Sequence, residues 1–379
     1  MKRFAALLFF VASTATGADW NAAVAAYKKG DYQAALREFQ AVLKENPNYA
    51  GAYFYVGACQ ERLDRKKEAL ENYQKASQME PSNPTFALAF ARLATDQGRP
   101  GEALKALEHV KLDSLKGEQK ALILGALARA KLALGDNHGA VAAAQAATQA
   151  APTSAEAWVT LGAALSRLDK NAEAFAAYRR AFELTGDAAI GNVAANAGMR
   201  AARLAKGEEA NARYAQAAAV AVKAYEKKPS AELALLAAEG FLGADRYDDA
   251  LRWLDRVGAE NALVTYYRAQ CAQGKGEVQR AEKLLREALA KQPDDRLRRL
   301  IYNSLGFVLD KQKRYKDAEQ AYQEAGNQTK VAEMRDKQKK HEQNLKADEE
   351  ARRIEELRKA QEELRRLRGG VAPTPPPEP

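Results

Sequence analysis

The side chains that most often carry out chemistry in proteins are few in this sequence. It contains three histidines and two cysteines. A metal site needs several such ligands at short, regular spacings, so that one turn or one helix face can present them together. His109, His138 and His341 have no cysteine or histidine partner at such a spacing. We therefore predict neither a metal site nor a bound cofactor.

Motifs for nucleophilic catalysis and for phosphate binding are also missing from the sequence. It has no glycine-rich phosphate loop, no Gly-x-Ser-x-Gly turn and no cysteine and histidine placed as a nucleophile and its base. Carboxylate pairs such as Asp248-Asp249 and Glu349-Glu350 are typical of solvated helix faces. We predict that the protein is not an enzyme. An enzyme, or an accessory of one, whose site forms only in three dimensions stays open as an alternative.

The two cysteines, Cys59 and Cys271, lie far apart in the sequence, on helix faces that the pattern predicts to be buried. A buried thiol behaves as a small hydrophobic side chain. We expect two separate thiols, and a disulfide between them is the alternative in an oxidising compartment.

Composition indicates the fold class. Hydrophobic residues make up 47% of the 379 residues, with a large share of alanine, and there are 12 prolines and 24 glycines. A chain rich in Ala, Glu, Lys, Leu and Arg with helical periodicity is typical of all-α proteins. The net charge of +9 permits weak attraction to anionic surfaces, but a solvated surface with excess Lys and Arg explains it better. Nothing in the sequence indicates a specific nucleic-acid partner.

The first eighteen residues have the layout of a secretory signal peptide. Lys2-Arg3 precede the apolar run 4–12, and small residues including Thr16 and Ala18 follow. The apolar run is too short to span a membrane comfortably. We predict a signal peptide at 1–18, cleavage after Ala18, and an exported protein that is periplasmic or secreted.

The elements that organise the rest of the chain form a repeat. Small residues recur in pairs twelve positions apart: Ala23 and Ala35, Gly57 and Ala69, Ala91 and Ala103, Ala128 and Ala140, Gly162 and Ala174, Ala238 and Ala250, Ala269 and Ala281, Gly306 and Ala318. Ala35, Ala69 and Ala103 are 34 residues apart, as are Ala140 and Ala174. A fixed period of this length predicts a solenoid of helix pairs. The small side chains would let the two helices of a pair cross closely, and neighbouring pairs must stack because none can bury its apolar face alone.

Other positions share the period. A large apolar residue follows the second small residue by four: Phe39, Tyr73, Leu107, Tyr178, Leu254, Leu285 and Tyr322. Proline often closes the unit, at Pro47, Pro81, Pro152 and Pro293, and the segment "AEAWVTLGAALSRLDKNAEAFAAYRRAFEL" has Trp158, Leu161 and Gly162 in order. These residues resemble the tetratricopeptide repeat over 19–327, in about eight units and a degenerate ninth at 188–229 with a lengthened second helix. The resemblance implies a right-handed α-solenoid of about nine helix-turn-helix repeats.

The resemblance also implies a peptide-binding groove lined by the first helix of each repeat. In the register of the family, the residues that face this groove are Phe54, Arg62, Leu88, Arg92, Arg167, Tyr266, Gln270, Asn303, Phe307 and Lys311. Aromatic and arginine side chains suit protein partners. Some members of the family grip a terminal carboxylate with a Lys-x-x-x-Asn pattern on successive first helices, and this sequence lacks that pattern, which argues against the acidic tails of cytosolic chaperones.

The pattern changes after the last repeat. Residues 328–368 lack proline and are dense in charge, with acid-to-base pairs four apart at Glu349/Arg353, Glu355/Lys359 and Glu362/Arg366, an order that stabilises a helix. Val331 and Met334 are expected to cap the last repeat. Beyond them we expect a free charged arm or one strand of a short coiled coil, in a mostly monomeric protein, with weak contact to an anionic surface. The Pro-rich segment 369–379 is predicted to be a disordered tail.

These observations predict a non-enzymatic scaffold or adaptor in the cell envelope that binds peptides or helices of other proteins in its groove. A scaffold for polysaccharide or cell-wall machinery is the alternative.

Overall fold

The computed structural model describes residues 19–367, and every regular element among these residues is a helix. The all-α fold predicted from the sequence is confirmed. The predicted signal peptide at 1–18 and the Pro-rich tail at 369–379 lie outside the described residues. Contacts divide the chain into two compact units, the first ending at Pro229 and the second beginning at Ser230.

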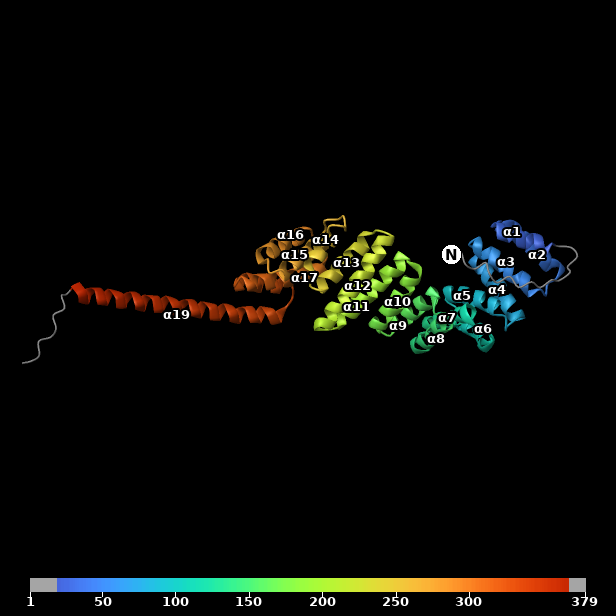
Figure 1. Ribbon diagram of the computed structural model, residues 1–379, viewed down its shortest axis with the longest axis horizontal. Helices are drawn as coiled ribbons and strands as arrows, with labels where there is room; N and C mark the ends of the chain where they lie inside the picture. The colour runs from blue at the N-terminus through green and yellow to red at the C-terminus, as the bar shows by residue number, and fades with distance from the viewer. Residues whose placement is uncertain (1–18, 368–379) are drawn as a thin grey trace, which may run out of the picture. The chain divides into compact units, whose positions relative to one another are not determined.

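The first unit consists of consecutive helix pairs, each helix packing mainly on the next one in the chain (Figure 1). Its helices are α1 (Trp20–Lys29), α2 (Tyr32–Glu45), α3 (Ala50–Arg62), α4 (Lys66–Met79), α5 (Pro84–Asp96), α6 (Pro100–Glu108), the 3-10 helix η1 (Leu112–Ser114), α7 (Gly117–Ala133), α8 (Asn137–Ala150), α9 (Ala155–Arg167), α10 (Asn171–Thr185), α11 (Ala188–Leu204) and α12 (Gly207–Lys227).

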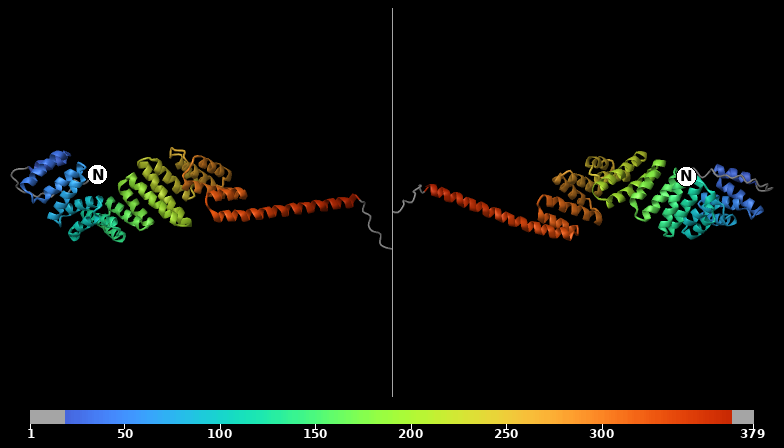
Figure 2. Two further views of the ribbon diagram at one scale, coloured as in Figure 1. Left: turned by 180° about the vertical axis from the view of Figure 1, so that it is seen from behind. Right: turned by 60° about the horizontal axis from the view of Figure 1, so that its bottom comes forward.

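The second unit repeats this arrangement and adds one long helix. It contains α13 (Ala231–Gly243), α14 (Tyr247–Leu254), α15 (Ala262–Gly274), α16 (Val278–Ala290), α17 (Asp295–Lys311), α18 (Tyr315–Glu324) and α19 (Gln328–Leu367). α19 packs on α18 with its first turns and then continues past the last pair (Figures 1 and 2).

The turns inside the pairs follow from local chemistry. Gly30 and Gly135 take left-handed conformations with φ of 86° and 82°, which glycine adopts without steric cost. The next residues, Asp31 and Asp136, accept hydrogen bonds from backbone N–H groups and so cap α2 and α8.

The predicted close crossings are present. An added Cβ at Gly57, Gly162 or Gly306 would lie 3.0, 2.8 or 2.8 Å from the ring of the tyrosine on the partner helix. The small residues that the period selects on the second helices, including Ala69 and Ala318, are fully buried. Glycine at these crossings therefore leaves room for a tyrosine ring between two helices.

The degenerate repeat uses different residues for its crossing. α12 is 21 residues long, as its sequence predicts. Gly191 and Gly198 lie against Ala224 and Ala217, where an added Cβ would be 2.6 and 2.8 Å from the alanine Cβ atoms. The spacing of Gly198 and Ala217 is nineteen residues rather than twelve, so this crossing lies further from the turn between α11 and α12 than in the other repeats.

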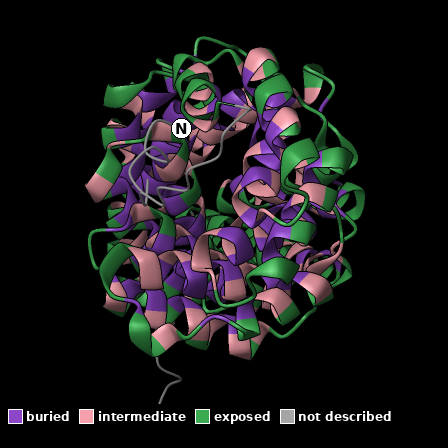
Figure 3. Ribbon diagram, turned by 90° about the vertical axis from the view of Figure 1, so that its right-hand side faces the viewer, coloured by how far each residue is buried: buried purple, intermediate pink, exposed green. Residues whose placement is uncertain are grey.

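Burial follows the helix contacts. Figure 3 shows buried residues along the faces where helices meet, whereas the turns are largely exposed.

Cys59 and Cys271 are free and buried, and burial raises the pKa of these thiols to about 12 and about 11, which keeps them protonated and unreactive. None of the helices in 19–367 is long and apolar enough to cross a membrane.

The start of α19 closes the last repeat. Val331 and Met334 are 3% and 0% exposed and belong to the same core cluster as Leu305 and Tyr322. From residue 342 to residue 367 every side chain is exposed. α19 therefore changes along its length, from a cap on the core to an exposed helix.

Candidate functional site

In the first unit, the apolar residues predicted to face a groove contribute to packing. Phe54 is half-buried, with its ring centroid 5.2 Å from that of Phe86 and 5.7 Å from that of Tyr73. Leu88 and Phe54 both pack against the core cluster that contains Tyr73. Both side chains hold neighbouring repeats together, and a partner could reach only the edges that remain open.

The arginines of the first unit differ in their environment. Arg92 forms an ion pair with Glu61 of the preceding repeat, and Glu61 also accepts a hydrogen bond of 2.9 Å from the hydroxyl of Tyr73. Burial, with the Glu61 carboxylate, raises the pKa of Tyr73 well above its usual range, so this hydroxyl stays a donor. Arg62 is exposed, with its guanidinium 5.7 Å from the ring centroid of Tyr32, and Arg167 is also exposed.

In the second unit, two predicted residues connect α15 to α17. The Gln270 amide donates a hydrogen bond of 2.8 Å to the Ser304 hydroxyl. Tyr266 is half-buried and packs against the core cluster of the last repeats. Burial raises the pKa of Tyr266, and a hydrogen bond with Ser304 opposes this rise. These side chains fix the two first helices relative to each other.

The other three predicted residues lie on one face of α17. Phe307 is 41% exposed, and the Lys311 ammonium lies 5.4 Å from the centroid of its ring. The Asn303 amide oxygen accepts a hydrogen bond of 2.9 Å from Asn327. Together Asn303, Phe307 and Lys311 form an accessible surface on the last repeat.

Two residues of this face were not identified from the sequence. Leu300 is 46% exposed and lies seven residues before Phe307, and Arg296 lies four residues before Leu300. Within residues 230–327, Leu300 and Phe307 are the exposed large hydrophobic residues. We call Arg296, Leu300, Asn303, Phe307 and Lys311 the α17 stripe. Their spacing at helical periodicity was the signal that could have revealed the whole set.

The α17 stripe sits on a helix that is held on its other sides. Ile301, Leu305 and Val308 are 0%, 4% and 0% exposed. The Lys337 ammonium of α19 donates to the Asp310 carboxylate at 2.7 Å. α17 cannot turn to bury the stripe without breaking this packing.

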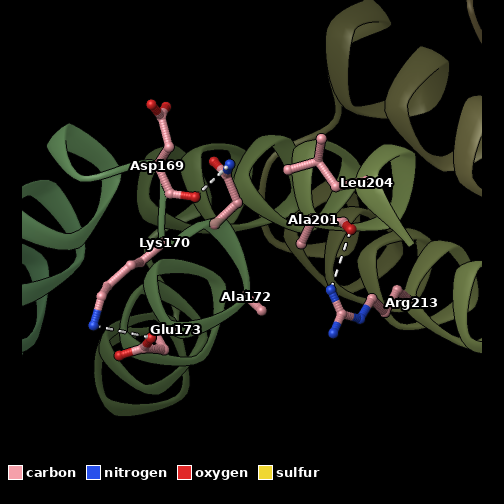
Figure 4. Close-up of a pocket in the computed structure, with 8 residues that line it drawn as sticks. Asp169, Lys170, Ala172, Glu173, Ala201, Leu204 and Arg213 are labelled. Carbon is pink, nitrogen blue, oxygen red and sulfur yellow. Dashed lines mark hydrogen bonds and ion pairs between the residues drawn. The ribbon is translucent and has the colours of Figure 1, made fainter.

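A small depression of about 210 Å³ lies in the first unit, next to the start of α10 and the end of α11. Figure 4 shows its polar groups paired with one another: Lys170 with Glu173 at 3.5 Å, and Arg213 donating to the carbonyl of Ala201 at 3.2 Å. Among the described residues, no group of three or more His, Cys, Asp or Glu could hold a metal ion. The depression therefore offers few free groups to a ligand.

Comparison with protein-family models gives three matches. Two models of the tetratricopeptide repeat match residues 21–84 and 266–330, and residues 66–130. A model of the bacterial transcriptional activator domain matches residues 109–188. A comparison with curated proteins found no match.

Several solved structures match part of this chain at low identity. A structure of MamA from Desulfovibrio magneticus RS-1 is 18% identical, covers 43% of this chain and 91% of its own, and has a TM-score of 0.39. The structure titled as a functional characterisation of Pseudomonas aeruginosa pilF is 18% identical, with coverages of 56% and 91% and a TM-score of 0.44. YrrB, described as a TPR protein with an unusual peptide-binding site, is 19% identical, with coverages of 52% and 94% and a TM-score of 0.37.

The family assignment rests on three agreeing observations. Small residues recur at the period of the repeat, helix pairs cross at those residues, and repeat models match residues 21–130 of the first unit and 266–330 of the second. Residues 21–130 and 266–330 are therefore tetratricopeptide repeats, which supports a role as a protein-interaction scaffold.

Proposed function

We propose that this protein is an exported scaffold of the cell envelope that binds a segment of a partner protein on the first helices of its second unit. The observation that carries the proposal is the exposure of Leu300 and Phe307, at 46% and 41%, on a helix whose opposite face is buried. Aromatic and apolar anchors on a rigid surface are typical of protein-binding hot spots. Gln270 and Ser304 hold the adjacent first helix in place.

Affinity purification tests the choice of partner class. The full-length protein carrying Phe307→Asp is compared with the unchanged protein in pull-downs from envelope extract, with quantitative mass spectrometry. We expect one set of proteins to be lost from the Phe307→Asp pull-down, because a charged side chain cannot be buried in an apolar contact. A matched Leu134→Asp variant, at a residue 50% exposed directly after α7, should keep that set.

The identity of the proteins lost decides between the alternatives. Non-enzymatic envelope proteins support an adaptor, whereas synthases or cell-wall enzymes support a scaffold for that machinery. Identical sets with Phe307→Asp and with the unchanged protein would show that the second unit is not the binding surface.

The export proposal rests on the first eighteen residues and on the residue that follows them. Asp19 caps α1, with its carboxylate accepting from the N–H groups of Asn21 and Ala22 at 2.9 and 3.1 Å. Cleavage after Ala18 would leave this cap intact. We expect N-terminal sequencing of protein from the periplasmic or secreted fraction to begin at Asp19. A full-length protein that starts at Met1 and stays in the cytoplasm would contradict the proposal.

The exposed part of α19 is proposed to be an arm of a mostly monomeric protein. Ile354, Leu357 and Leu364 are 52%, 57% and 53% exposed. Full burial of such a side chain is worth about 1.5–3 kcal/mol, a short seam would achieve only part of it, and association costs at least about 4 kcal/mol. Acid-base pairs such as Glu355 and Lys359, 3.6 Å apart, support the single helix, and its bases permit weak contact with an anionic surface.

Sedimentation equilibrium at micromolar concentration tests whether the protein is a monomer or pairs through α19. We expect a monomer, with or without residues 345–379. A tight dimer that becomes monomeric when these residues are removed would show that the apolar stripe of α19 pairs two chains.

A further inference from the structure

We propose that the α17 stripe binds an acidic segment of its partner, one that carries two apolar side chains about two helical turns apart. This inference rests on the proposed function and adds the chemistry of the partner. Its basis is the order of the side chains along α17: a base at Arg296, apolar groups at Leu300 and Phe307, and a base at Lys311.

The spacing of these residues places them on one face. Steps of four, seven and four residues return to nearly the same side of an α-helix. At about 1.5 Å per residue, the two bases lie about 22 Å apart along the axis and the two apolar groups about 10 Å apart. A partner segment that covers both apolar groups therefore passes both bases.

The apolar centre of the stripe has no cover within the described part of the chain. Leu300 and Phe307 keep 46% and 41% of their surface exposed, whereas Ile301 and Val308 on the other side of the helix are fully buried. Exposed apolar groups gathered on a fixed surface are typical of interaction sites. The two side chains offer anchors that a partner can cover with its own apolar groups.

The charges at the two ends determine the sign of the partner. Among residues 19–367, Arg296 has no ion pair, and Lys311 makes only the contact with the Phe307 ring. Two nearby bases are already neutralised: Arg298 pairs with Asp295 at 2.7 Å, and Arg314 pairs with Asp317 at 2.6 Å. The nearby acid Asp310 is paired with Lys337 at 2.7 Å. The stripe therefore presents uncompensated positive charge to an incoming segment.

A nucleic acid fits this surface less well than an acidic protein segment. A duplex carries one phosphate for about every 1.7 Å of its axis, and its binding sites neutralise many of these charges with closely spaced bases. Two bases separated by two apolar groups offer few phosphate contacts. A segment with a carboxylate beyond each end of an apolar pair would match both the two apolar side chains and the two bases of the stripe.

Synthetic peptides of defined sequence test the inference directly. The first probe is Glu-x3-Leu-x6-Leu-x3-Glu, with Ala and Gln at the other positions, neutral blocked ends and a neutral fluorophore. The second replaces both Glu by Lys, and the third replaces both Leu by Ser. Binding to the full-length protein is measured by fluorescence anisotropy at low and high salt.

We expect the Glu peptide to bind and to weaken as salt is raised, because salt screens exposed charge pairs. The Lys peptide and the Ser peptide should bind at least about tenfold more weakly, which corresponds to about 1.4 kcal/mol. The double change Arg296→Glu with Lys311→Glu should reverse the preference between the Glu and Lys peptides. The matched control, Arg252→Glu with Lys283→Glu, changes the net charge equally at side chains 73% and 79% exposed on α14 and α16, and should leave the preference unchanged.

Equal binding of the Glu and Lys peptides, or a preference that the control reverses as well, would overturn the inference. So would the absence of binding to the Glu peptide. The proposed function is tested separately by the pull-down. If Phe307→Asp removes envelope partners but no acidic peptide binds, the scaffold function holds and only the acidic class of partner is wrong.

Discussion

Replacing Met334 by alanine is expected to lower the free energy of unfolding of the last repeat by about 2–5 kcal/mol, the usual cost of removing a large buried apolar side chain. Met334 is 0% exposed and shares a core cluster with Leu305, Leu309 and Tyr322. Without its side chain, the surface of the last helix pair would lose the cover that a terminal repeat requires. Amide hydrogen exchange of α17 and α18 measures the effect.

The control for this prediction is on the same helix. Leu357 is 57% exposed, and Leu357→Ala should change the exchange of α17 and α18 by no more than about 0.5 kcal/mol. Equal effects of Met334→Ala and Leu357→Ala would mean that the start of α19 does not act as a cap.

Alanine substitutions at two helical glycines are expected to change stability in opposite directions. At Gly306 an added Cβ would lie 2.8 Å from the ring of Tyr322, which is 3% exposed and cannot move aside. Overpacking of this kind costs about 1–3 kcal/mol. At Gly125 an added Cβ would meet no atom within 4 Å, so alanine should stabilise α7 by about 0.5–1 kcal/mol through its higher helix propensity.

Hydrogen exchange of α17–α18 for Gly306→Ala and of α7–α8 for Gly125→Ala measures both effects. If Gly306→Ala stabilised its repeat as Gly125→Ala does, the close crossing of helix and tyrosine ring would not be what selects glycine there.

The sequence predicts the repeats well where the helices have regular lengths. Gly57, Gly162 and Gly306 were identified by spacing alone, because each contacts a tyrosine at the same offset on the partner helix. The crossing residues of the repeat at 188–229 were not identified by this spacing, because α11 and α12 cross at other offsets. The division between Pro229 and Ser230 was also not predicted, because it depends on contacts between repeats rather than on spacing within them.

The candidate site was predicted only in part. The family register indicates the direction of a side chain, so Asn303, Phe307 and Lys311 were identified together. It does not indicate which groups a neighbour already occupies, and Arg92 is paired with Glu61 while Gln270 is bonded to Ser304. Leu300 was missed although it lies on the same face, because exposure depends on what the neighbouring helices leave uncovered.

Site-specific photocrosslinking tests most directly whether the second unit binds a partner protein. A photoreactive phenylalanine analogue is placed at position 307 of the full-length protein in its host cells, and at Leu134, which is 50% exposed on the first unit, as a control. The proposed scaffold predicts a discrete crosslinked adduct from position 307 that is absent from position 134. No adduct from position 307, or the same adducts from both positions, would contradict it.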